Sequence, residues 1–214
     1  MKRLSIAIIM AFSMLAMFAQ EETIRVDYSG KQPTIRDFLQ AYLLLLPDIN
    51  DLDECDVEGM SLFENFRHAV LYQGEGIALE PSEKLVIDLK NGYACYEQHH
   101  ESAVSRIEMC YWNQADGKHK LFACVRQTFD NGWYVAGQYD NMEFFRYNNA
   151  AKTMKKISYE EIGVDAVNEE SSNMNVLRSI SLPRTGKDIE VTWWDINGEC
   201  GASSLKWNGH GFNF

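Results

Sequence analysis

Residues 103–127 read AVSRIEMCYWNQADGKHKLFACVRQ, two alternating runs separated by the dipeptide Asp116-Gly117. Asx-Gly between such runs is a strong signal for a β-hairpin, because both residues tolerate positive φ. A type I turn with Gly117 in the left-handed conformation, followed by a bulge, predicts a definite register. The predicted pairs are Ile107 with Val125, Met109 with Ala123, and Tyr111 with Leu121, and all six side chains should share one buried apolar face.

The opposite face of this hairpin is mixed and carries Cys110 and Trp112. In the predicted register Cys110 faces Phe122 and lies diagonal to Cys124, which is a poor geometry for a disulfide. The chain has 5 cysteines, an odd number, and no CxxC motif, so we expect neither a zinc knuckle nor a redox motif. We expect mostly buried free thiols, with a Cys110–Cys124 disulfide as the alternative.

Residues 1–19 have the three parts of a secretory signal peptide. Basic Lys2 and Arg3 precede an apolar run that reaches Phe18, and the small Ala19 stands at the expected cleavage site. The run is shorter than the roughly 20 apolar residues that a membrane-spanning helix needs. We therefore expect cleavage near Ala19, export to the periplasm or the extracellular space, and no stable membrane span after processing. A retained membrane anchor is the alternative.

Acidic side chains outnumber basic ones, and the formal net charge of the whole chain is −11. Loss of residues 1–19 would remove Lys2 and Arg3 and make the chain more acidic still. Nucleic acids and anionic membrane surfaces repel such a chain, so we expect no nucleic-acid partner.

Two amphipathic helices are predicted before the strands begin. Thr34, with Asp37 three residues later, is typical of a helix N-terminus, and apolar residues then recur at helical spacing until Pro47. A second capping pattern, Ser61 with Glu64, predicts a helix that ends near Gly74. The two helices should form a helical hairpin.

The segment that joins these helices, residues 48–59, is strongly acidic. A calcium-binding loop would need oxygen ligands at alternating positions, a glycine at the sixth and a glutamate at the twelfth, and neither reading frame supplies them. A solvated connection is therefore favoured over a calcium site. The adjacent His99 and His100 lack nearby partner ligands, so we expect no metal site there.

From Lys84 onward the apolar period changes from that of a helix to that of a strand. Five Asx-Gly pairs divide this half of the chain, so we expect an antiparallel sheet built from neighbouring strands. The predicted fold class is α+β, an N-terminal helical hairpin packed on a mainly antiparallel β-meander rich in Asx-Gly hairpins.

The helical hairpin and sheet should occupy residues 20–162. A three-stranded meander should occupy residues 176–214, either as part of the same domain or as a second domain. Strands are predicted at residues 23–28, 85–89, 93–97, 104–113, 118–129, 133–137, 142–147, 153–157, 176–182, 188–194 and 202–207.

No catalytic motif accompanies this pattern. The serines lack a GxSxG elbow, and no glycine-rich phosphate loop follows a strand. Aromatic residues give the best functional indication, because an exposed aromatic strip on a sheet can stack on a sugar ring or anchor a protein. We predict Trp112 and Trp133 as ligand-binding residues, although aromatic residues in strands are more often core.

The segments CYWNQADGKHKLFA and LKNGY, together with the closing LPRTGKDIEVTWWDINGE and LKWNG, resemble those of uncharacterised small exported proteins of gut-type Gram-negative bacteria. FFRYNNAAKTM is similar to a turn of β-propeller blades. Neither resemblance implies catalytic residues. We therefore expect an exported, non-enzymatic protein that binds a protein or a glycan, without a cofactor. A secreted hydrolase or carbohydrate-processing protein is the alternative.

Overall fold

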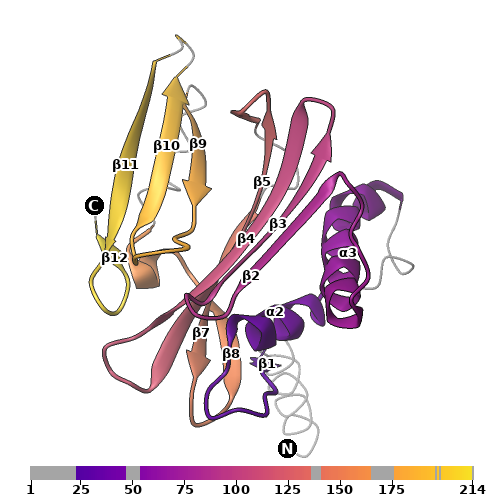
Figure 1. Cartoon of the computed structure of the whole chain (residues 1–214). Helices are drawn as coiled ribbons and strands as arrows, with labels where there is room; N and C mark the ends of the chain where they lie inside the picture. Colours follow the sequence, from indigo (N-terminus) through magenta and orange to yellow (C-terminus); the bar gives the residue numbers. More distant parts are fainter. Residues whose placement is uncertain are drawn as a thin grey trace, which may run out of the picture.

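The protein is built in three layers (Figure 1). A computed structural model describes residues 23–46, 54–135, 141–164, 176–195, 197 and 199–213. Two helices cover one face of a large sheet, and a smaller sheet covers the other face. The predicted signal peptide lies outside the described residues. Within those residues, no helix is both long enough and apolar enough to cross a membrane.

The main sheet is antiparallel throughout, in the order β1-β8-β7-β5-β4-β3-β2, with β6 also paired to β5. The α+β fold class with an antiparallel sheet is therefore confirmed. Two pairings join strands that are not neighbours in the chain, β5 with β7 and β8 with β1. The strands are β1 (Thr23–Arg25), β2 (Glu83–Asp88), β3 (Tyr93–His100), β4 (Ala103–Asn113), β5 (His119–Asp130), β6 (Trp133–Val135), β7 (Asn141–Asn148) and β8 (Thr153–Ile157).

The C-terminal strands form a separate sheet in the order β12-β11-β10-β9. It adds a short fourth strand to the predicted three and stacks on the main sheet instead of extending it. A short 3-10 helix, η2 (Glu160–Ile162), precedes it in the chain. The strands are β9 (Val176–Ser181), β10 (Ile189–Asp195), β11 (Cys200–Trp207) and β12 (Phe212–Asn213). Each strand predicted from sequence is present, with described ends that differ by up to three residues.

The helix α2 (Ile35–Leu43) begins as predicted, because the Thr34 N–H donates to the Asp37 Oδ2 at 2.7 Å. The predicted start of the second helix at Ser61 is wrong, since α3 runs over Glu54–Glu75. Acidic residues stabilise the positive N-terminal end of a helix, which explains why residues 54–59 are helical and not a loop. Residues 47–53 lie outside the described residues, so the helical hairpin and the calcium question for this segment stay predictions.

The predicted register of the β4–β5 hairpin is wrong by one residue. Ile107 lies opposite Arg126, Met109 opposite Cys124, and Tyr111 opposite Phe122. Gly117 does adopt the left-handed conformation, with φ of 66°. The loop, however, is one residue longer than predicted, because the Asp116 Oδ1 accepts hydrogen bonds from the N–H groups of Lys118 and His119 at 2.8 and 3.0 Å.

This shift divides the six residues that were predicted to share a face. Ile107, Met109 and Tyr111 face the helices, whereas Leu121, Ala123 and Val125 face the second sheet. The hydrophobic pattern specifies a register strongly only when one face is buried and the other is solvated. Both faces of this hairpin are buried, so the apolar pattern alone does not select the register.

The same shift separates two of the cysteines. Cys110 lies opposite Ala123 in the core between the sheets, while Cys124 faces the helices. The prediction of buried free thiols is confirmed for Cys95, Cys110 and Cys124, whereas Cys200 is free but exposed. Burial raises the pKa of the Cys95 thiol to about 12, so this thiol is protonated at neutral pH.

Polar side chains of the main sheet hold the edge of β9. The Gln127 Oε1 accepts a hydrogen bond from the Ile180 N–H at 3.1 Å, and the Glu108 Oε2 accepts one from the Leu182 N–H at 3.4 Å. The Tyr93 hydroxyl donates to the Glu108 Oε1 at 2.6 Å. Glu108 is only 6% exposed. Its burial raises the pKa of the carboxyl above the ordinary value of 4.5.

The Glu108→Gln variant is expected to become more stable relative to the wild type as pH rises. Between 4.5 and the raised pKa, the folded wild type holds a proton that the unfolded chain releases, so its free energy of unfolding falls with rising pH. A glutamine can accept from Leu182 and donate to the Tyr93 oxygen without titrating. Urea unfolding measured at several pH values will give the difference in the free energy of unfolding.

Glu97→Gln is the matched control for this experiment. Burial opposes ionisation of Glu97, but hydrogen bonding by Lys84 and the charge of Arg106 hold its pKa below the ordinary value. The stability of this variant relative to the wild type should therefore fall as pH rises through the lowered pKa toward 4.5. A difference for Glu108→Gln that does not change with pH would contradict the assigned pKa direction.

Gly163→Ala is expected to destabilise the fold by about 3 kcal/mol, from left-handed strain and a backbone clash. Gly163 has φ of 72°, and a Cβ atom would lie 2.2 Å from the Phe212 carbonyl oxygen on β12. Gly76→Ala is the control, since Gly76 has φ of 73° and open space around it. Its cost should be about 1 kcal/mol in urea unfolding, and equal losses in the two variants would show that the close approach to β12 is unimportant.

Candidate functional site

Trp133 lies at the tip of a tight hairpin between β5 and β6. Asn131 and Gly132 have φ of 49° and 82°, as the two central residues of a type I′ turn require. The turn pairs Asp130 with Trp133. The Trp133 side chain is displayed to solvent, and the residue is 57% exposed.

Trp133 belongs to an aromatic cluster that both sheets contribute to. We define this cluster as Phe129, Trp133, Tyr134 and Trp194. The ring of Trp194, on β10, lies 6.2 Å from that of Trp133 at an interplanar angle of 62° and 6.4 Å from that of Tyr134 at 27°. The Tyr134 ring lies 6.0 Å from that of Phe129. The cluster therefore offers angled ring faces and not a flat platform.

The borders of the aromatic cluster are both apolar and polar. Leu177, opposite Trp194 in the β9–β10 pair, is exposed, as is Val135 next to Tyr134. Asp195 follows Trp194, and its Oδ1 accepts the N–H groups of Asn197 and Glu199 at 2.9 and 2.8 Å. The Arg106 guanidinium lies 4.9 Å from the centre of the Phe129 ring. Ring faces beside amide, carboxylate and guanidinium groups can stack on a ligand and hydrogen-bond its hydroxyl groups.

Trp112 lies at the opposite end of the β4–β5 hairpin from Trp133. It is 4% exposed, and its Nε1 donates to the Lys187 carbonyl oxygen at 2.8 Å. Its ring stacks on Trp207 at 5.7 Å and meets the edge of Phe212. The two predicted ligand-binding residues therefore lie far apart. Most of the Trp112 ring is buried in the core between the sheets. Trp112 also lines a pocket at this end of the strand.

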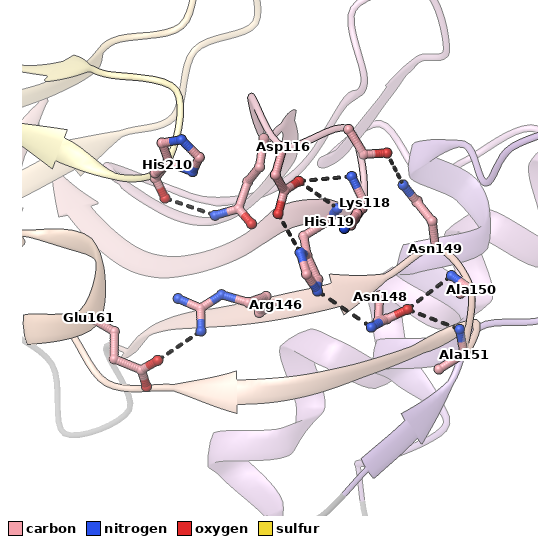
Figure 2. Close-up of polar contacts among 12 residues, drawn as sticks. Asp116, Lys118, His119, Arg146, Asn148, Asn149, Ala150, Ala151, Glu161 and His210 are labelled. Atoms are coloured by element: carbon pink, nitrogen blue, oxygen red, sulfur yellow. Dashed lines mark hydrogen bonds and ion pairs between the residues drawn. The ribbon is translucent and has the colours of Figure 1, made fainter.

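An aspartate–histidine pair braces the β4–β5 turn, as Figure 2 shows. The His119 Nδ1 lies 2.6 Å from the Asp116 Oδ2, and its Nε2 lies 3.4 Å from the Asn148 Nδ2. Hydrogen bonds from His119 and from the Lys118 N–H lower the pKa of Asp116 to about 2. The Asn148 Oδ1 also accepts hydrogen bonds from the N–H groups of Ala150 and Ala151. Asn148 therefore links the β4–β5 turn to the β7–β8 turn. We assign the pair a structural role.

Potential metal ligands and carboxylates are dispersed among the described residues. In the part of the chain that the structure describes, no group of three or more His, Cys, Asp and Glu side chains is placed to hold a metal ion. The pocket beside Trp112 has no carboxylate among its lining residues. Glu108 is a buried carboxylate, but it is bonded to Tyr93 and Leu182 between the sheets.

The sequence singled out Trp133 as a candidate but not the rings that lie beside it. Trp194 and Tyr134 become neighbours only because the second sheet packs beside the β5–β6 hairpin. The dipeptide Trp193-Trp194 was the available signal, because consecutive strand residues point to opposite sides and one of them needs cover from another element. No protein-family model, no curated protein and no solved structure matched the chain.

Trp112→Ala and Trp133→Ala should have very different effects on stability. Trp112 is buried and hydrogen-bonded, so its loss should cost about 3–5 kcal/mol of unfolding free energy. Trp133 is mostly exposed, so its loss should cost less than about 1 kcal/mol. Urea unfolding of both variants measures this difference. A large loss for Trp133→Ala would mean that this side chain holds the fold together and is not available to a ligand.

Proposed function

We propose that this protein is an exported, non-enzymatic binding protein that uses the aromatic cluster to bind a glycan. The observation that carries the proposal is the exposure of Trp133 at a hairpin tip, beside rings from the second sheet. Burying a tryptophan face stabilises a complex, whereas leaving it in water has no benefit for folding. A structural role alone does not explain why this ring is displayed.

Further observations support a glycan over other partners. Acidic composition disfavours nucleic acid, and the signal-peptide pattern of residues 1–19 supports export from the cytoplasm to a compartment where glycans are exposed. The border of the cluster combines Asn131, Asp195 and Asn197 with the rings, and such groups can bind sugar hydroxyls. A stable protein–protein interface usually buries a larger apolar area than the exposed Trp133, Val135 and Leu177 side chains provide.

The hydrolase alternative would need two carboxylates of unequal pKa converging in a cleft. Glu97 and Glu108 do have pKa values shifted in opposite directions. Each is engaged by neighbouring residues, and neither lines the pocket beside Trp112. This arrangement favours binding over hydrolysis.

Glycan-array screening of the mature chain, followed by calorimetric titration of the best ligand, tests the proposal. Trp133→Ala should weaken binding by about tenfold, the effect of losing one stacking contact of 1 to 1.5 kcal/mol. Tyr72→Ala is the matched control, because Tyr72 is an exposed aromatic residue on α3, across the main sheet. It should bind as the wild type does.

Three outcomes would overturn this proposal. The first is that no glycan binds. The second is that Trp133→Ala binds as tightly as Tyr72→Ala. The third is that a purified protein partner binds through Trp133 while glycans do not, which would replace the glycan with a protein. Release of sugar from a bound glycan would instead favour the hydrolase.

A further inference from the structure

A second candidate site lies at the other end of the seam between the sheets, far along β4 from the aromatic cluster. It is a pocket of about 190 Å³. Its walls come from the β2–β3 turn and from the loop between β9 and β10, and its floor from the end of β4. The lining residues are Lys90, Asn91, Cys110, Tyr111, Trp112, Asn113, Pro183, Gly186 and Lys187.

The pocket exists because β4 is longer than its neighbour at this end. β3 begins at Tyr93, opposite Cys110, and the last contact along this edge is the Tyr111 N–H to the Gly92 carbonyl at 3.2 Å. Strand residues two apart direct their N–H groups to the same side. The N–H of Asn113 therefore points to this side as well, beyond the end of β3 and toward the pocket.

Hydrogen bonds and an ion pair hold both walls in place. The Arg184 Nε lies 3.1 Å from the Asp88 Oδ2 and joins the β9–β10 loop to the β2–β3 turn. Asp88 also accepts the backbone N–H of Asn91 at 3.1 Å and its Nδ2 at 2.9 Å. The bond from Trp112 to the Lys187 carbonyl ties the loop to the floor. The pocket is therefore a preformed feature of the fold.

The charge of the lining is opposite to that of the chain. Its charged residues are Lys90 and Lys187, in a protein with a formal net charge of −11. Asp88, the carboxylate bonded to the pocket residue Asn91, is already paired with Arg184. The Asn113 Oδ1 accepts a hydrogen bond from Lys120, which leaves the NH2 of this amide as a donor. Lysines, an amide NH2 and a strand N–H are all groups that bind an anion.

We propose that this pocket binds the carboxylate of a small organic ligand. The lysines and the donors of Asn113 would hold the carboxylate, while Tyr111, Trp112 and Pro183 would contact an apolar or aromatic body. A volume of about 190 Å³ suits a small acid or the last residue of a peptide. Both sources present the same carboxylate. The proposal is independent of glycan binding by the aromatic cluster.

The test titrates the full mature chain and follows its amide signals by two-dimensional NMR. The probes are benzoate, the neutral benzamide, inorganic phosphate, and a tetrapeptide that ends in phenylalanine with either a free or an amidated C-terminus. Benzoate or the free-acid peptide should shift the Asn113 backbone and side-chain signals, and the neutral probes should bind about tenfold more weakly or not at all. Tighter binding of the peptide acid than of benzoate would identify a peptide C-terminus as the source of the carboxylate. Tighter binding of benzoate would identify a free acid as the source.

Lysine variants locate the site. Lys90→Gln and Lys187→Gln should each weaken carboxylate binding several-fold, and the double variant by about tenfold or more. Lys31→Gln is the matched control, an exposed lysine in the loop before α2, and it should leave binding unchanged. Both pocket lysines are exposed, so these variants should fold, and the dispersion of their amide spectra will check this.

Four results would overturn the proposal. The first is that no carboxylate shifts the Asn113 signals, and the second is that benzoate and benzamide bind equally well. The third is that the double lysine variant keeps full affinity for the carboxylate. The fourth is that phosphate binds more tightly than either acid. Because the readout is local to Asn113, loss of glycan binding at Trp133 would not affect it.

Discussion

The stacking of the two sheets depends on two backbone N–H groups at the edge of β9. The edge of a strand presents unpaired donors, and burying them without partners costs free energy. Gln127 and Glu108, both on the main sheet, accept the N–H groups of Ile180 and Leu182. These two hydrogen bonds add polar contacts to the apolar core that joins the sheets. This arrangement buries the Glu108 carboxyl group, and burial raises its pKa.

This constraint places both candidate binding sites on the seam between the sheets. At one end, β10 brings Trp194 to the β5–β6 hairpin and forms the aromatic cluster. At the other end, the β9–β10 loop meets the β2–β3 turn, where Arg184 pairs with Asp88 and the pocket forms above the free end of β4. Neither site belongs to one sheet alone. A ligand at either end would therefore contact residues whose relative positions depend on how β9 is held.

Burial on both faces also explains why the β4–β5 hairpin could not be aligned from its apolar pattern. Phe122 and Cys124 face the helices, while Leu121 and Ala123 face the second sheet, and all four are buried. Apolar residues on consecutive positions satisfy either register. The decisive interaction is polar and local, because the Asp116 side chain accepts two backbone N–H groups and stabilises a loop one residue longer.

The amino-acid sequence by itself determined the α+β class, nearly every strand, the Thr34 start of α2 and the buried free thiols, because periodicity, turn residues and caps are local properties. It also singled out Trp133, which follows directly from its turn. Only the tertiary structure decided the register of the central hairpin, the separate second sheet, the partners of Trp133 and the pocket at Asn113. These features arise where segments far apart in the chain meet, and no local pattern encodes which N–H, ring or charge will be opposite another.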